Sequence, residues 1–306
     1  MHFINRILVP IDFSENSLLA LEHAALMARI FKADLYLLHV IETMEFAYNV
    51  YDPLLLNKSN DEMEKFAINS LKKLAKKTCS EEMCIKNGIH LIPLVNKGRV
   101  ISEILDTAKN FTIDIIVMGT HGVKGFNEYF IGSNAHKTIA VSPCPVITIH
   151  TNADKPGFKN IVMPIDNSFH SRQKVDFTIE LASAYGAKVH ILGLFDTDDE
   201  MEKNKFELKI NTVEKAIENA NLSYEVHIVK GKNIAAESIS YSDKIKADLV
   251  VIMTDHESML TGTFLGGFAK QIVNHSKIPV LSIRPVEGYV EALDLTGISN
   301  PFNNPY

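Results

Sequence analysis

Three glycines near residue 120 could bring backbone N–H groups up to an anion. Gly119 and Gly122 frame a G-T-H-G run, and nine residues separate Gly122 from Gly132. Glycine has no Cβ, so a negatively charged group can approach its N–H directly. Gly132 precedes Ser133 and Asn134 at the start of a predicted helix, whose first turn offers unpaired N–H donors and the positive end of the helix dipole. The Ser133 hydroxyl can bond to a phosphate oxygen, so the pattern predicts a site for a phosphate-like anion.

Asp12 is the carboxylate best placed to take part in such a site. It ends the first predicted strand, and Ser14, two residues later, is a predicted N-cap of the next helix. Asp12 could be a catalytic base or an anchoring, helix-capping carboxylate, and we favour the anchor. His121 could likewise act in catalysis or form a loop-stabilising hydrogen bond, and we favour the hydrogen bond. No catalytic residue is therefore predicted.

Other kinds of site find less support. The chain has no G-x-x-x-x-G-K-[ST] sequence, which argues against a P-loop NTPase. It also lacks the S-G-G-x-D-S motif of pyrophosphate-releasing synthetases. Cys79 and Cys84 lack the additional nearby ligands that a metal would need, so we interpret them as free thiols. Cys144 is expected in the core, and no metal site is predicted.

The strands that would position these residues are short apolar runs separated by stretches of helical periodicity. Because the runs are apolar throughout, they predict strands buried on both faces of a parallel sheet. Strands joined by helices through right-handed crossovers form an open, doubly wound sheet, which binds ligands at the carboxyl ends of its strands. In the first half, strands are predicted near residues 5–11, 34–40, 89–95, 114–118 and 145–150, and helices near 15–31, 57–79, 98–109 and 132–141. Asp12, Val40 and Met118 then end strands one, two and four.

The second half of the chain repeats the first. Asn160–Asp166 matches Arg6–Asp12 at an offset of 154 residues. Asp248–Ile252 matches Asp114–Met118 at an offset of 134, so the first half holds about 20 additional residues. The repeated strands are predicted near residues 159–165, 188–194, 224–229, 248–253 and 279–284. We therefore expect an α/β protein with two tandem doubly wound open sheets of about five mostly parallel strands, arranged as a pseudo-dimer.

Composition is that of an ordinary globular protein. The 306 residues are 46% hydrophobic and 22% charged, and this length predicts two domains. The net charge of −6 gives no attraction to nucleic acid or anionic lipid, and no stretch reaches the roughly 18 apolar residues of a membrane span. Three cysteines argue against a disulfide framework, and no secretory segment precedes the first strand. We expect a cytoplasmic protein.

These motifs together make the chain similar to the universal stress protein family. The resemblance is carried by V-P-x-D in the first strand, Val9–Asp12, and by G-x-x-G, nine residues and G-S over residues 119–133. It extends to both halves, as in tandem members, and implies an ATP-binding domain. By resemblance, Asp12 and the Val40 backbone would hold the adenine, while the glycines would line the ribose and phosphates. The implied cofactor is ATP, alone or with Mg²⁺, and the implied site residues are Pro10, Asp12, Val40, Met118, Gly119, Gly122, Gly132, Ser133 and Asn134.

The second half departs from the family motif. At the offset of 134, the loop residues correspond as Gly119 to Met253, Gly122 to His256, Gly132 to Gly266 and Ser133 to Gly267. Two side chains thus replace glycines where the backbone would approach phosphate. We expect a degenerate site that does not bind ATP in the family manner. A loop that merely tolerates either sequence is the alternative.

The matches divide the chain into four segments. They are a nucleotide-binding domain (1–151), a linker (152–158), a second domain with a degenerate loop (159–286) and a C-terminal tail (287–306). By resemblance, the domains would pair through their last strands, Val146–Ile149 and Val280–Ile283, with a homodimer as a further expectation. Residues 44–56 could be a lid, a partner surface or a packed loop, and the tail is expected to be disordered or loosely wrapped.

Three classes of function remain open. The leading one is a cytoplasmic ATP-binding regulator of the stress response, whose second domain is mainly structural and whose protein partner is unidentified. A slow ATPase or phosphotransferase ranks lower, because no dedicated base or metal cluster accompanies the glycines; at most weak ATP hydrolysis is expected. A ligand-free structural or interaction protein is the third class, and the intact glycines argue against it for the first half.

Overall fold

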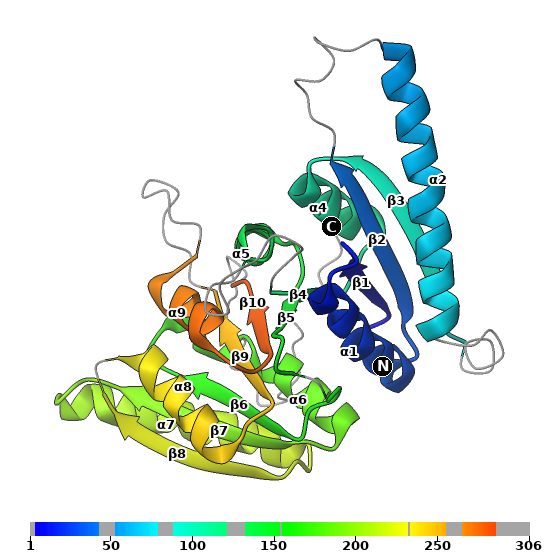
Figure 1. Cartoon of the computed structure of the whole chain (residues 1–306). Helices are drawn as coiled ribbons and strands as arrows, with labels where there is room; N and C mark the ends of the chain where they lie inside the picture. Colours follow the sequence, from blue (N-terminus) through cyan, green and yellow to red (C-terminus); the bar gives the residue numbers. More distant parts are fainter. Residues whose placement is uncertain are drawn as a thin grey trace. The chain divides into compact units, whose positions relative to one another are not determined.

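Two compact units, Met1–Pro156 and Gly157–Tyr306, make up the chain. The computed structural model describes residues 4–42, 53–78, 88–120, 132–153, 155–231, 233–254 and 265–285. Each unit is a sheet covered by helices on both faces (Figure 1). The two units therefore have the same layered α/β architecture.

In the first unit, the described residues form five parallel strands. In spatial order they are β3 (Leu91–Gly98), β2 (Asp34–Glu42), β1 (Arg6–Pro10), β4 (Ile115–Gly119) and β5 (Val146–Ile149). The helices are α1 (Glu15–Phe31), α2 (Pro53–Thr78), α4 (Val100–Asn110) and α5 (Ser133–Val141). Right-handed crossovers place α1 and α2 on one face of the sheet and α4 and α5 on the other.

The strand order reverses between β1 and β4, which lie side by side in the sheet. The chain leaves β1 into α1 on one face, and it leaves β4 into α5 on the opposite face. An open sheet has its ligand-binding crevice outside the carboxyl ends of two such strands. This topology places the crevice between the residues that follow Pro10 and those that follow Gly119.

The second unit repeats this arrangement with one local change. Its parallel strands, in spatial order, are β10 (Val280–Ile283), β9 (Leu249–Met253), β6 (Asn160–Ile165), β7 (Lys188–Phe195) and β8 (Tyr224–Lys230). The helices are α6 (Val175–Tyr185), α7 (Glu200–Asn219), α8 (Ile234–Ile245) and α9 (Gly267–His275), preceded by a short 3-10 helix, η2 (Phe169–Arg172). The expected fold class, two tandem doubly wound parallel sheets, is confirmed. The pairing of the two sheets stays a prediction.

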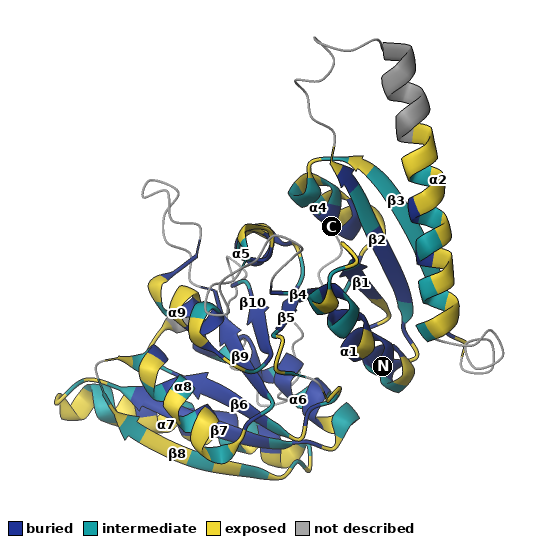
Figure 2. Ribbon diagram, in the orientation of Figure 1, coloured by how far each residue is buried: buried dark blue, intermediate teal, exposed yellow. Residues whose placement is uncertain are grey.

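The strands differ in how deeply they are buried. Residues of β1, β4, β6, β9 and β10 are mostly inaccessible, and they form the dark inner ribbons of Figure 2. Two edge strands are not buried on both faces as predicted. β3 is half-buried apart from the exposed Lys97, and β8 exposes Glu225, His227 and Ile228. Because β5 and β10 also end the sheets of their units and are buried throughout, a mainly apolar composition overestimates burial only at β3 and β8.

Helix α1 begins as its sequence predicts. The Ser14 side chain accepts a hydrogen bond from Ser17 N at 3.3 Å, which confirms Ser14 as the N-cap. The helix ends at Lys32, whose φ of 56° lies in the left-handed region. The aligned helix α6 ends with Gly186 at φ 60°, so both units terminate this helix in the same way.

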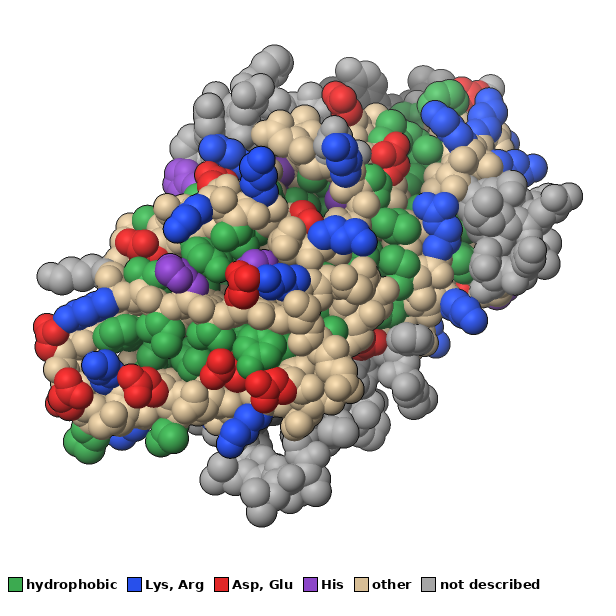
Figure 3. Space-filling model, turned by 90° about the horizontal axis from the view of Figure 1, so that it is seen from below, with side chains coloured by type: hydrophobic (Ala, Val, Ile, Leu, Met, Phe, Trp, Pro, Cys, Tyr) green, Lys and Arg blue, Asp and Glu red, His purple; other side chains and the backbone are tan. Residues whose placement is uncertain are grey.

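Charged side chains of both signs are interspersed over the face of the molecule shown in Figure 3. This distribution accords with 31 basic and 37 acidic residues that nearly balance. Among the helices that the structure describes, none is both long enough and apolar enough to cross a bilayer.

Candidate functional site

The carboxyl end of β1 presents Asp12 to solvent on a braced turn. Asp12 Oδ1 accepts hydrogen bonds from Ser14 N at 3.0 Å and from Ser14 Oγ at 2.5 Å. Phe13 between them has a φ of 62°, a left-handed conformation that turns the chain sharply from strand to helix. Pro10 is the last residue of β1. The turn thus holds an exposed carboxylate at the predicted crevice.

The carboxyl end of β4 meets the start of α5. Gly132 N donates to Thr120 O at 2.6 Å, and Thr120 N donates to Ile149 O at 3.0 Å. These bonds bring Gly132 beside Thr120, the residue that follows β4, although eleven residues separate the two in sequence. The intervening segment 121–131, including Gly122 and His121, lies outside the described residues.

The first turn of α5 has the features of an anion-binding helix terminus. Gly132 is the N-cap, and no side-chain hydrogen bond caps the helix. Ser133 and Asn134 are exposed in that turn. Early backbone N–H groups of a helix have no partner within the helix and carry partial positive charge. The geometry therefore suits a phosphate group at Gly132–Asn134.

Gly119 lies against α1 as well as beside the crevice. A Cβ built on Gly119 would lie 2.8 Å from Asn16 C and 2.9 Å from Asn16 O, closer than real side chains come to backbone. Close packing of α1 on β4 therefore requires glycine at position 119 even without a ligand. The sequence pattern pointed only to a ligand at this glycine.

Val40 lies within β2, not at its end as predicted. The strand continues to Glu42 and pairs with β3 as far as Gly98. Ladder hydrogen bonds to β3 extend the strand past its apolar run. His39, the preceding residue, bonds through Nδ1 to Ile11 O at 2.7 Å, and its ring lies 5.0 Å from that of Phe13. His39 thus ties β2 to the Asp12 turn.

In the second unit, the helix that follows β6 begins late. At the offset of 154, α6 starts at the position of Leu21, whereas α1 starts at Glu15. The intervening residues form η2 and a turn instead. Met253, which replaces Gly119, borders the same small cavity as Ser171 and Lys174. The second unit thus has both a side chain in place of Gly119 and a later helix start. The first unit explains why: α1 packs so closely on Gly119 that a side chain there would displace the helix.

That cavity leaves almost no room for a ligand. Its volume is about 10 Å³, which is near the minimum that one water molecule needs. It is bordered by Pro164, Asp166, Ser168, Ser171, Lys174, Met253 and Phe268. The carboxyl end of β6 is therefore filled by protein in the second unit.

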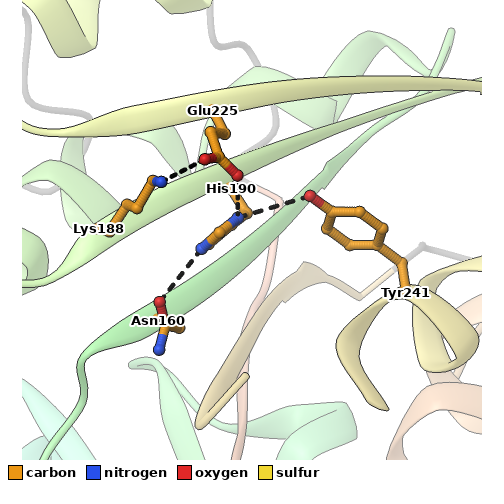
Figure 4. A network of polar contacts seen from close by, with 5 residues as sticks. All are labelled: Asn160, Lys188, His190, Glu225 and Tyr241. Carbon is orange, nitrogen blue, oxygen red and sulfur yellow. Dashed lines mark hydrogen bonds and ion pairs between the residues drawn. The ribbon is translucent and has the colours of Figure 1, made fainter. Parts of the chain in front are cut away.

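A separate polar cluster lies at the amino ends of the second sheet (Figure 4). His190, on β7, has its Nε2 3.3 Å from Asn160 Oδ1 and its Nδ1 3.6 Å from Glu225 Oε2. Tyr241 on α8 places its hydroxyl 3.5 Å from the same Nδ1. Burial lowers the pKa of His190, although Glu225 acts in the opposite direction. Because ligands bind at the carboxyl ends of such strands, we assign this cluster at the amino ends a structural role.

The remaining predicted features contribute no further chemistry to the described part of the chain. Cys79 and Cys84 lie outside it, as do residues 44–52 of the 44–56 segment and all of the tail. Cys144 is partly buried rather than fully buried in the core as expected, and burial raises the pKa of its thiol to about 12. Within the described ranges, no three His, Cys, Asp or Glu side chains cluster as metal ligands would.

Comparison with known proteins identifies the family. The model of the universal stress protein family matches residues 4–150 and again residues 157–284. Universal stress protein YxiE of Bacillus subtilis is 30% identical over 151 residues, which are 47% of this chain and 98% of that protein. Universal stress protein MJ0577 of Methanocaldococcus jannaschii is 32% identical over 154 residues, covering 47% of this chain and 93% of that protein.

A solved structure supports the fold over both units. A universal stress protein from Archaeoglobus fulgidus aligns with a TM-score of 0.72 at 20% identity, covering 94% of this chain and 98% of that one. The single-domain relatives each span about half of this chain, whereas the family model matches it twice. The chain therefore belongs to the universal stress protein family and is a tandem member of it.

Proposed function

We propose that this protein is a cytoplasmic, ATP-binding regulator of the stress response, with one nucleotide bound by the first domain. The observation that carries the proposal is the junction of β4 and α5, where the Gly132–Thr120 hydrogen bond sets an uncapped helix start beside the strand end. Phosphates would bind at Gly132, Ser133 and Asn134. Adenine would lie toward Asp12 and the Val40 backbone, and Mg²⁺ could accompany the phosphates.

At the carboxyl end of β6, the described residues of the second domain enclose a cavity of only about 10 Å³. The strand ends of this domain are filled by η2, Met253 and Lys174, so we assign it a structural role. The expected stoichiometry is one nucleotide per chain. Calorimetric titration with ATP measures that number directly, and two equivalent sites would contradict the assignment. Mass spectrometry of small molecules released from the denatured protein would identify a nucleotide that co-purifies.

Gly132→Val tests the phosphate site. The backbone at Gly132 has φ −62° and ψ 150°, which valine adopts without strain, so the fold should survive. Its branched side chain would crowd the phosphates, and we expect at least about a tenfold loss of ATP affinity, or about 1.4 kcal/mol. Gly266→Val is the matched control, because Gly266 caps α9 with φ −56° and ψ 152° in the second domain. Unchanged affinity in folded Gly132→Val would remove this loop from the site.

Asp12→Asn separates an anchor from a catalytic base. An anchor that loses its charge but keeps an acceptor oxygen should weaken ATP binding by about 0.5–1.5 kcal/mol, the value of one hydrogen bond. Any phosphate release at saturating ATP should then persist. Asp166→Asn in the second domain should leave ATP affinity unchanged. Normal binding by Asp12→Asn with complete loss of a measurable hydrolysis rate would favour a slow ATPase instead.

A further inference from the structure

Lys174 is a lysine buried at the ligand-binding end of the second domain. Only 3% of its surface is exposed. At the offset of 154 its counterpart in the first domain is Ala20, which is fully buried and uncharged. A charged group is almost never buried to this extent unless a partner compensates it.

The partners of Lys174 belong to the segment that replaces the helix start. Lys174 Nζ donates to Ser171 O at 2.8 Å and lies 3.4 Å from Ser171 Oγ. Ser171 Oγ in turn accepts from Asp166 N at 3.0 Å. Lys174 and Asp166 both border the 10 Å³ cavity at the end of β6. The Lys174 ammonium therefore lies in the same loop as Asp166, the carboxylate that corresponds to Asp12 of the first domain.

The charge of Lys174 lowers the pKa of Asp166. Burial is the largest influence and raises the pKa of Asp166, but the Lys174 charge and hydrogen bonds from Ser168 and Ser171 outweigh it. The net pKa lies below the usual value. Asp166 Oδ1 also accepts from Ser168 N at 3.0 Å and from Ser168 Oγ at 2.6 Å. The carboxylate is thus held ionised by groups of its own domain.

We propose that Lys174 is the residue that makes the second domain independent of ligand, because its side chain fills the carboxyl end of β6 and supplies the counter-charge of Asp166. ATP would then act on the first domain alone. The second domain would keep one conformation whether nucleotide is present or absent. The contacts that carry the proposal lie within the second domain, and its statement about ATP rests on the proposed function.

Lys174→Met in the full chain removes the charge while keeping much of the side-chain length. We expect the pKa of the Asp166 carboxyl, followed by NMR in aspartate-labelled protein, to rise above its ordinary value of about 3.9. Lys209→Met is the matched control. Lys209 Nζ reaches the same loop but donates to the carbonyls Asp166 O at 2.9 Å and Ser168 O at 3.0 Å. An Asp166 pKa that stays low in Lys174→Met would overturn the proposal.

A double-mutant cycle covers the case in which Lys174→Met is too unstable for the NMR titration. The same substitution in an Asp166→Asn background leaves no unpaired charge, so the double variant should fold and unfold at a higher urea concentration than Lys174→Met. Equal destabilisation in both backgrounds, or a double variant that also fails to fold, would show that Lys174 does not act through Asp166.

Hydrogen exchange with and without ATP tests the claim that ATP leaves the second domain unchanged. ATP should protect amides around residues 12–20 and 132–141, and it should leave residues 160–175 and 266–275 unchanged. Protection of the second set would refute the proposal for Lys174. Protection of neither set would instead refute ATP binding by the first domain, so the two failures are distinguishable.

Discussion

Gly119→Ala tests whether glycine at this position is required for the packing of α1 on β4, independently of any ligand. The new Cβ would lie 2.8 Å from Asn16 C and 2.9 Å from Asn16 O. An ordinary carbon contact is about 3.5–4.0 Å, so the first turn of α1 must move by roughly 0.7 Å or more. Because the obstacle is backbone, a change of side-chain rotamer cannot relieve it. Overpacking of this kind costs about 1–3 kcal/mol, or roughly 2–12 °C in the midpoint of a domain this size.

Differential scanning calorimetry of the full chain without nucleotide measures this loss. Gly267→Ala is the matched control, because a Cβ there has nothing within 4 Å and would stand in the first turn of α9. It should leave the melting temperature equal or slightly higher, since alanine is the better helix former. If nucleotide-free Gly119→Ala melts like the wild type, the packing explanation is wrong, and the glycine at 119 would be explained by the ligand alone.

Three further predictions concern the stability of the fold. Ser14→Ala removes the α1 cap and should cost about 0.5–2 kcal/mol in urea unfolding, whereas Ser168→Ala should not lose a helix cap, because Ser168 makes no side-chain capping bond. Lys32→Gly relieves a left-handed residue where the second unit already has Gly186, and should raise stability by about 0.5–1 kcal/mol; a lower urea midpoint would contradict this. Burial lowers the pKa of folded His190, so the unfolded chain binds more protons and wild-type stability falls as the pH drops below about 6.5. His190→Gln should flatten that part of the curve, and an unchanged slope in urea titrations would assign the proton uptake elsewhere.

Strand positions were predictable because burial imposes a simple pattern. The apolar runs at Ile7–Val9, Ile115–Met118 and Val250–Ile252 fall inside β1, β4 and β9. The tandem architecture followed from matched runs at constant offsets, which reflect the same sheet built twice. Strand β8 was less predictable, because it is apolar at Val226 and Ile228 and yet Ile228 is exposed.

The candidate site was predictable in part for a different reason. Glycines and a helix start predict where an anion can bind, and Gly132 does cap α5 beside the end of β4. The presence of a glycine in the sequence does not show whether a ligand or another part of the protein packs against it. At Gly119 the near neighbour is Asn16 of α1, which is remote in sequence and becomes visible only when the helix is packed on the strand. The available signal for the second site was Lys174, a charge in a position where the first repeat has alanine.

The loss of glycine at position 253, the 3-10 segment and Lys174 are best understood as one coupled change. A side chain at the end of β9 cannot coexist with a helix turn packed as α1 packs on Gly119. Once that turn is displaced into η2, the position of Ala20 is no longer inside a regular helix, and a lysine there can fold back to Ser171 O. Met253→Gly alone should therefore not restore a ligand site, because Lys174 and η2 would still fill the strand ends. It would instead leave a cavity, which typically costs about 2–5 kcal/mol for a large apolar side chain.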